Sequence, residues 1–315
     1  MTDITAIGEI LIDLTQTGTN AAGVPLFAAN PGGAPANVAV AAAKLGAAAA
    51  FIGKAGKDGF GSYLRRVLEE NGVSSRGLCT GKRPTTMAVV SVDADGERDF
   101  RFIRGADSDL VPEEIHAEAV QKSKVLHFGS VSLTQETSRS AVLKTVEAAR
   151  QAGVLVSYDP NYRPALWNSG EEAVTWMQKP LSMVDIIKLS EEEVPLLTGS
   201  DDLEEGSRCL AQQGIALVLV TLGGRGAFCR WQEETFTVPG VSVKIADTNG
   251  AGDTFLGAVL SRLCRRGAQP LQNLDCRELK DIVAFANCAA AATCSRSGAI
   301  PAMPTLKELE GGISR

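Results

Sequence analysis

The sequence contains few of the side chains from which metal and redox sites are usually built. It has two histidines, His116 and His127, and no pair among its seven cysteines has the C-x-x-C spacing. A Cys/His zinc site and a thioredoxin-like motif are therefore both disfavoured. We expect seven free thiols, buried in a protein of a reducing compartment.

Long runs of basic and of apolar residues are also missing. The formal net charge is -6 at pH 7, so neither nucleic acid nor an anionic membrane is an expected partner. The most apolar stretches, 38–52 and 284–293, are alanine-rich and too short to span a bilayer. The first residues show neither the basic nor the apolar region of a signal peptide. We therefore expect a soluble, cytoplasmic protein.

A chain of 315 residues with 44% apolar content can form a large core. Short β-rich runs alternate with longer helical patterns along it. We expect strands at residues 5–13, 49–54, 125–128, 154–159, 186–189 and 216–221. We expect helices at 37–45, 61–71, 137–152, 171–179, 191–197, 203–214, 255–263 and 285–293. This alternation predicts an α/β fold with a mostly parallel sheet covered by helices on both faces.

Two segments in the N-terminal third do not follow the α/β pattern. Residues 14–30 are small and polar without a helical period. Residues 85–103 are typical of a hairpin, with Asp95-Gly96 as the turn between strands at 87–93 and 98–103. We expect the segments at about 14–30 and 85–104 to pair into a small lid sheet on a single domain, residues 1–315. The exposed edge of this hairpin could pair with a second copy and form a homodimer.

The run Asp-Thr-Asn-Gly-Ala-Gly-Asp-Thr-Phe-Leu-Gly-Ala at 247–258 carries the most information about function. Gly250, Ala251 and Gly252 leave backbone N–H groups uncovered at the start of an expected helix, which favours an anion site. A carboxylate beside a bound anion is unfavourable unless it has a proton to remove. The run therefore predicts phosphoryl transfer with Asp253 as the general base. An ordinary turn, with Asp253 as a helix cap or dipole partner, is the alternative.

Polar residues also gather where the expected strands end, and open parallel sheets bind ligands at those ends. Residues at or just past an expected strand end are Asp13, Gly129, Asp159, Ser190, Thr221 and Asp247. A second glycine-rich turn, Asn-Pro-Gly-Gly-Ala-Pro-Ala-Asn-Val-Ala at 30–39, leads into an alanine-rich helix. Asn37 could present its amide to a polyol there, although a tight turn with close helix packing also accounts for this run.

With both glycine-rich runs the chain resembles the PfkB (ribokinase-like) family of carbohydrate kinases, and within it the fructokinases. The runs that carry the resemblance are 8–13 (Gly-Glu-Ile-Leu-Ile-Asp), 31–37, 127–130, 159–164 with Trp167, 221–227 and 298–301. The resemblance implies a ribokinase-like three-layer α/β/α fold with a small β-sheet lid. It also implies ATP-dependent phosphorylation of the terminal hydroxymethyl group of a ketose, D-fructose giving fructose 6-phosphate.

The resemblance further implies roles for individual residues. Asp253 would be the base and the Gly250-Ala251-Gly252 turn would hold the transferring phosphoryl group. Sugar contacts are expected from Asp13, Gly33, Asn37, Arg104, Asn161 and Arg163. Nucleotide contacts are expected from Lys188, Ser190, Thr221, Gly223, Gly226 and Asn287. Glu193 aligns with a residue that reaches Mg²⁺ through water, and Asp247 and Asn249 fall in a loop that holds a monovalent cation such as K⁺ in some members.

Several of these residues have plainer explanations. Asp13 and Asn287 could be ordinary caps, Asn287 could also make a core hydrogen bond, and an exposed Arg104 would be unremarkable in its segment. Ser190 stands where the family has Asn, and the three glutamates that follow it suit a helix N-terminus. Asn249 replaces a more usual Thr or Val.

Parts of the sequence also bear on functions other than that of a fructokinase. A 2-keto-3-deoxygluconate kinase of the same family shares the motifs and needs a cation for the substrate carboxylate, which Arg104 or Arg163 could supply. A non-catalytic sugar or nucleotide sensor needs no base, so the intact Gly-Ala-Gly-Asp run disfavours it. No G-x-G-x-x-G follows the first expected strand, so a dinucleotide-dependent dehydrogenase is disfavoured.

Overall fold

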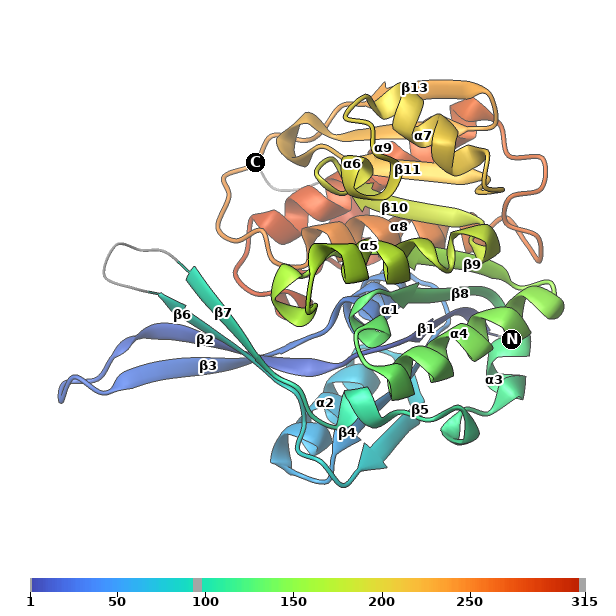
Figure 1. Ribbon diagram of the computed structural model, residues 1–315. Coiled ribbons are helices and arrows are strands. Elements are labelled where there is room, and N and C mark those ends of the chain that lie inside the picture. The colour runs from blue at the N-terminus through green and yellow to red at the C-terminus, as the bar shows by residue number, and fades with distance from the viewer. Residues whose placement is uncertain (1, 93–97, 312–315) are drawn as a thin grey trace.

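The computed structural model describes residues 2–92 and 98–311, arranged as one large and one small β-sheet with helices around the large one (Figure 1). The expected turn Asp95-Gly96 lies outside the described residues. The large sheet has nine strands in the order β13-β12-β11-β10-β9-β8-β1-β4-β5. Its strands are β1 (Thr2–Ile7), β4 (Ala49–Gly56), β5 (Val73–Gly81), β8 (Ser123–Gly129), β9 (Leu155–Asp159), β10 (Ile186–Ser190), β11 (Leu217–Thr221), β12 (Ala227–Trp231) and β13 (Glu234–Val238). All neighbours from β5 to β11 are parallel, and β12 and β13 extend the sheet as an antiparallel edge.

Helices cover both faces of the large sheet, as the alternating pattern predicts. One face packs on α1 (Ala34–Lys44), α2 (Gly59–Glu70), α8 (Ala251–Cys264) and α9 (Cys276–Cys294). The other packs on α3 (Ala117–Gln121), α4 (Glu136–Gln151), α5 (Gly170–Gln178), α6 (Glu193–Thr198) and α7 (Leu203–Ala211). The described chain ends with α10 (Leu306–Glu310). Within the described residues, no helix combines the length and apolar character needed to cross a membrane.

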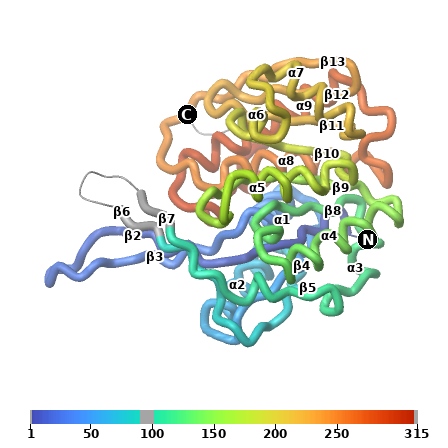
Figure 2. The backbone as a smooth tube through the Cα atoms, viewed as in Figure 1, coloured from blue at the N-terminus to red at the C-terminus, as the bar shows by residue number. Residues whose placement is uncertain are grey.

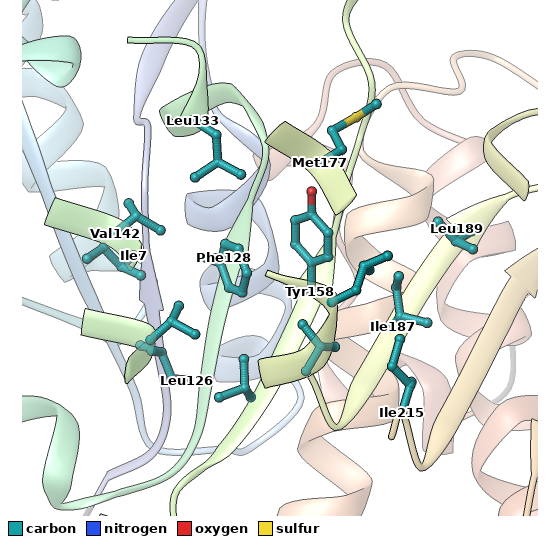
Figure 3. Packing of buried hydrophobic residues seen from close by; sticks show 14 of the residues in the cluster. Ile7, Leu126, Phe128, Leu133, Val142, Tyr158, Met177, Ile187, Leu189 and Ile215 are labelled. Atoms are coloured by element: carbon teal, nitrogen blue, oxygen red, sulfur yellow. The ribbon is translucent and has the colours of Figure 1, made fainter. Parts of the chain in front are cut away.

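The core on the α4 side shows why the central strands read as continuous apolar runs. Phe128 of β8 and Tyr158 of β9 stack with ring centroids 4.5 Å apart, and Ile7 and Val142 pack in the same cluster (Figure 3). Strands that are buried on both faces need apolar side chains at successive positions. This packing holds the strand ends, and the residues that follow them, in fixed positions.

The small sheet projects from the body as a lid, which confirms the expected pairing of the two N-terminal segments (Figures 1 and 2). Its strands are β2 (Leu11–Thr19), β3 (Pro25–Gly32), β6 (Met87–Val92) and β7 (Arg98–Ile103), in the order β3-β2-β6-β7. The two hairpins are antiparallel and join through parallel pairing of β2 with β6. Leu26, Phe27 and Ile103 leave large apolar side chains exposed on this sheet.

The prediction of a single strand at residues 5–13 is wrong. β1 ends at Ile7, and Gly8, with φ +153°, turns the chain out of the large sheet into β2. A Cβ at Gly8 would lie 2.7 Å from Pro35 Cγ, so the turn needs glycine. Asp13 therefore lies inside the lid sheet rather than at a strand end of the large sheet. Asp247 also follows a loop rather than a strand.

Three strands, β5, β12 and β13, were not expected from the sequence. They lie at the two edges of the large sheet, where pairing with distant segments decides the conformation more than local pattern does.

All seven cysteines are free, as expected, but only Cys229 and Cys264 are buried. The other five are partly exposed, because they lie where helices and edge strands meet solvent.

Candidate active site

The turn before α8 exposes backbone donors at a helix N-terminus. Gly250 adopts φ +74°, and the N–H of Ala251 donates to the Thr248 carbonyl over 3.3 Å. In the described part of the chain, the N–H groups of Gly252 and Asp253 have no acceptor. The expectation that Ala251 offers a free N–H is therefore corrected, since Asp253 supplies the donor instead. Two free N–H groups and the helix dipole suit an anion.

The Asp253 carboxylate is 8% exposed and is held in place by helix α1. Its Oδ2 accepts a hydrogen bond from Asn37 Nδ2 over 2.8 Å. Burial raises the pKa of Asp253 to about 6; nearby Asp159 adds to this, and the amide of Asn37 opposes it. The carboxylate is then ionised at neutral pH and still basic enough to accept a proton.

Beside Asp253 lies a cavity of about 720 Å³ under the lid. It brings together most of the residues expected on the sugar side, namely Asp13, Gly33, Asn37, Asn161 and Arg163. Burial raises the pKa of Asp13 to about 6, against the charge of Arg163. Ala88 and Phe102 of the lid strands close one wall. Carboxylates, amides and a guanidinium around one cavity match the hydroxyls of a polyol.

Arg104, which was expected to contact the sugar, does not line this cavity. Its guanidinium donates to Asp107 Oδ2 over 2.7 Å and to Thr134 Oγ1 over 2.8 Å, and it lines neither this cavity nor the second one. The buried Asp107 carboxylate requires a cationic partner, so it holds Arg104 at the root of the lid.

A second cavity of about 420 Å³ lies on the other side of the turn at Gly252. It is lined by the expected nucleotide-side residues Thr221, Gly223, Gly226 and Asn287. Both cavities share Thr248 and Gly252. Asn287 Nδ2 donates to the carbonyls of Val238 and Pro239, so its amide group shapes the cavity wall. This agrees with the alternative explanation of Asn287 as a residue that makes a hydrogen bond in the core. The free N–H of Gly252 therefore lies on a turn that both cavities reach.

Lys188 places a buried positive charge next to this turn. Its Nζ lies 3.0 Å from Asp159 Oδ2, and a Cβ on Gly252 would lie 2.9 Å from the same nitrogen. Burial disfavours the charged form, but the carboxylates of Asp159 and Glu193 outweigh it and raise the pKa of Lys188. The ammonium group is charged at neutral pH and faces the anion turn.

Glu193 and Ser190, expected near metal and nucleotide, line neither cavity. The Glu193 oxygens accept the N–H groups of Tyr162 over 2.6 Å and of Ser190 over 2.7 Å. Glu193 therefore joins the segment after β9 to the end of β10. Among residues 2–92 and 98–311 no group of three or more His, Cys, Asp or Glu side chains could hold a metal ion.

Asp247 ties two loops together beside the turn. Its Oδ1 accepts the N–H of Asn249 over 3.1 Å and its Oδ2 that of Gly298 over 3.0 Å. Asn249 also lines the larger cavity.

Comparison with known proteins places this geometry in a family. Residues 1–306 match the model described as pfkB family carbohydrate kinase. The chain belongs to the pfkB family. Fructokinase-1 of Oryza sativa subsp. japonica is 43% identical over 97% of this chain and 96% of that protein. The expected family and the carbohydrate-kinase class of activity are therefore confirmed.

Solved structures of pfkB-type kinases match the fold closely. Fructokinase with bound ATP from Xylella fastidiosa gives a TM-score of 0.92 at 32% identity, covering 99% of this chain and 98% of that one. Fructokinase from Vibrio cholerae O395 in fructose, ADP and calcium ion bound form gives 0.88 at 34% identity, covering 100% and 99%. The ribokinase-like fold expected from the sequence is confirmed.

Some cavity residues of this pfkB protein were missed by sequence reasoning. Glu9, Phe102 and Thr248 line the larger cavity, and Ile245 lines the second one. Phe102 could have been identified from the alternation of the lid strand. The sequence around Glu9 does not indicate a cavity residue, because its pattern predicts one continuous buried strand.

Proposed function

We propose that this protein transfers the γ-phosphoryl group of ATP to the terminal hydroxymethyl group of D-fructose, giving fructose 6-phosphate. One observation carries the proposal. The buried base Asp253 and the anion turn at Gly252 stand where the cavity that suits a polyol meets a second cavity. The fructokinases named above support fructose as the sugar and ATP as the donor.

The reaction follows from this placement. The sugar occupies the larger cavity, with Asp13, Asn37, Asn161 and Arg163 as hydrogen-bonding partners, and ATP occupies the second cavity beside Thr221, Gly223, Gly226 and Asn287. The sugar oxygen forms a bond to the γ-phosphorus while the bond to the ADP oxygen breaks. Asp253 takes the hydroxyl proton. The N–H groups of Gly252 and Asp253 and the Lys188 ammonium stabilise the negative charge on the phosphoryl oxygens.

We infer that Mg²⁺ enters with ATP, coordinated by phosphate oxygens and water. Mg²⁺ in kinase sites keeps several waters and needs few protein ligands, and this site offers no metal cluster in the described residues. The bound ion would neutralise charge on the phosphates. Asp247 and Asn249 are proposed to shape a K⁺ loop, because Asp247 holds both loop segments together.

The lid and the rest of the chain are proposed to act as one domain of 315 residues in the cytoplasm. Closure of the lid sheet over the sugar would exclude water and limit ATP hydrolysis. Exposed Leu26, Phe27 and Ile103 are the side chains through which two lids would form a homodimer.

An ATP-coupled assay with fructose, 2-keto-3-deoxygluconate, ribose and adenosine tests the proposal. We expect fructose to give the highest kcat/KM. Preference for the sugar acid would change the proposed substrate but leave the role of Asp253 intact, with Arg163, which lines the cavity, as a cation for the carboxylate. No turnover with any sugar, together with sugar binding, would favour a sensor.

A further inference from the structure

Glu9 is a buried acidic residue in the sugar cavity that the proposed mechanism does not use. It lies between β1 and β2, is 2% exposed, and lines the cavity together with Asp13 and Asp253. Its Oε1 accepts the N–H of Ala34, the first residue of α1, over 3.0 Å. Its Oε2 is buried and has no hydrogen-bond partner in the described part of the chain. A buried oxygen without a partner is costly, and a bound ligand is one way to satisfy it.

The surroundings of Glu9 favour its neutral form. Burial raises the pKa of Glu9 to about 8, and the charge of Asp107 adds to the rise; the backbone N–H groups of Glu9 itself and of Ala34 and the charge of Arg104 oppose it. Because Oε1 accepts the Ala34 N–H, the carboxyl proton belongs on Oε2. The charged groups facing this region from other elements are Asp13 of β2, Asp107 after β7, Asp253 of α8, Lys188 of β10, and Arg104 and Arg163 in loops.

We propose that Glu9 is a sugar-binding residue, whose uncharged carboxyl group donates a hydrogen bond from Oε2 to one hydroxyl oxygen of the bound ketose. This inference rests on the proposed function. Asp13 and Asp253 are acceptors above pH 6, so the hydroxyls that donate to them need a donor in return. A neutral acid can supply it, whereas a third carboxylate in the same cavity would repel the other two.

Substitutions of Glu9 separate this contact from a merely structural role. Glu9→Ala should raise the KM for fructose about 5- to 100-fold, with the KM for ATP changed less than about twofold. Glu9→Gln keeps an acceptor for Ala34 and a donor for the sugar, so its KM should stay close to that of the wild type. The KM of the wild type should rise above about pH 8 as Glu9 ionises, and that of Glu9→Gln should not. Glu147→Ala, at an exposed glutamate of α4, is the matched control.

Monodeoxy fructoses complete the test. One of these sugars should bind the wild type more weakly than fructose does. The same sugar should bind Glu9→Ala with an affinity equal to that of fructose. Equal losses in Glu9→Gln and Glu9→Ala, an unchanged fructose KM in Glu9→Ala, or a parallel rise in the KM for ATP would overturn the contact. If Glu9→Ala does not fold, Glu9→Gln and the pH dependence decide. A wild-type protein inactive on fructose overturns the proposed function and this inference together; an active one with unaffected variants overturns only the inference.

Discussion

Replacing Asp253 by Asn removes the proposed base while keeping its hydrogen bond. The amide oxygen of the new side chain can still accept from Asn37 Nδ2, which lies 2.8 Å from Asp253 Oδ2. The geometry of α8 and the two cavities should therefore persist. A general base contributes about 10²- to 10⁴-fold to the rate, so we expect kcat to fall by that factor with little change in KM.

The raised pKa of Asp253 adds a pH dependence to this prediction. With a pKa of about 6, the fraction of ionised base falls tenfold for each pH unit well below 6, and the wild-type kcat should fall with it. The residual activity of Asp253→Asn should show no such fall. Initial rates with saturating ATP and fructose between pH 5 and pH 8 measure both effects.

The burial of Asp253 also predicts that Asp253→Asn gains stability relative to the wild type as the pH rises towards neutrality. Asp253 has a pKa of about 6 in the folded state against 3.8 ordinarily, a difference that corresponds to about 3 kcal/mol at 1.4 kcal/mol per pH unit. The folded state then binds more protons than the unfolded state between pH 3.8 and 6, so the wild type loses stability as the pH rises through this window. Asp253→Asn has no charge to bury, and its free energy of unfolding relative to the wild type should increase by up to about 3 kcal/mol from pH 4 to pH 7.

Urea unfolding at both pH values, with Asp281→Asn on the exposed face of α9 as the control, measures this difference. Turnover close to that of the wild type in Asp253→Asn would refute the assignment of the base. A stability difference that does not change between pH 4 and pH 7 would refute the electrostatic reasoning while leaving the catalytic role open to the kinetic assay.

Three further substitutions test the surroundings of the site. Gly252→Ala would place a Cβ 2.9 Å from Lys188 Nζ. Steady-state kinetics should show kcat lowered roughly 10- to 100-fold, while the melting curve stays native. Unchanged turnover would contradict a close approach of the phosphate to this turn. Gly226→Ala would put a Cβ on a residue with φ +102°, where it clashes with the Val238 carbonyl. Thermal unfolding should show the free energy of unfolding lowered by about 1–3 kcal/mol, and ATP should bind more weakly. A variant as stable as the wild type would argue against the observed turn. Asp13→Asn should raise the KM for fructose about 10-fold while the KM for ATP stays constant, and a shift in the KM for ATP alone would remove Asp13 from the sugar side.

Local patterns were sufficient for much of the fold. The alternation of apolar strands and amphipathic helices identified α1, α4 and β8 to within a few residues, because burial on one or two faces imposes its own period on the sequence. The glycine-rich turn before α8 was also readable, since few residues other than glycine tolerate the backbone conformation seen at Gly250.

Contacts between distant segments were beyond such patterns. The hydrogen bond from Asn37 to Asp253 joins residues 216 positions apart, and the pairing of Lys188 with Asp159 crosses from one strand to the next. Arg104 was expected at the sugar, and its pairing with Asp107, three residues along the chain, was missed because the sequence does not show that Asp107 is buried.

The sequence alone therefore determined the family, the α/β architecture and the residue types at the anion turn, because these depend on period, spacing and backbone freedom. Only the tertiary structure decided which side chains face the cavities. It turned the chain at Gly8, placed Asp13 in the lid and buried Glu9 beside the larger cavity. It also raised the pKa of Asp253, since burial and the charge of neighbouring groups are properties of the assembled fold.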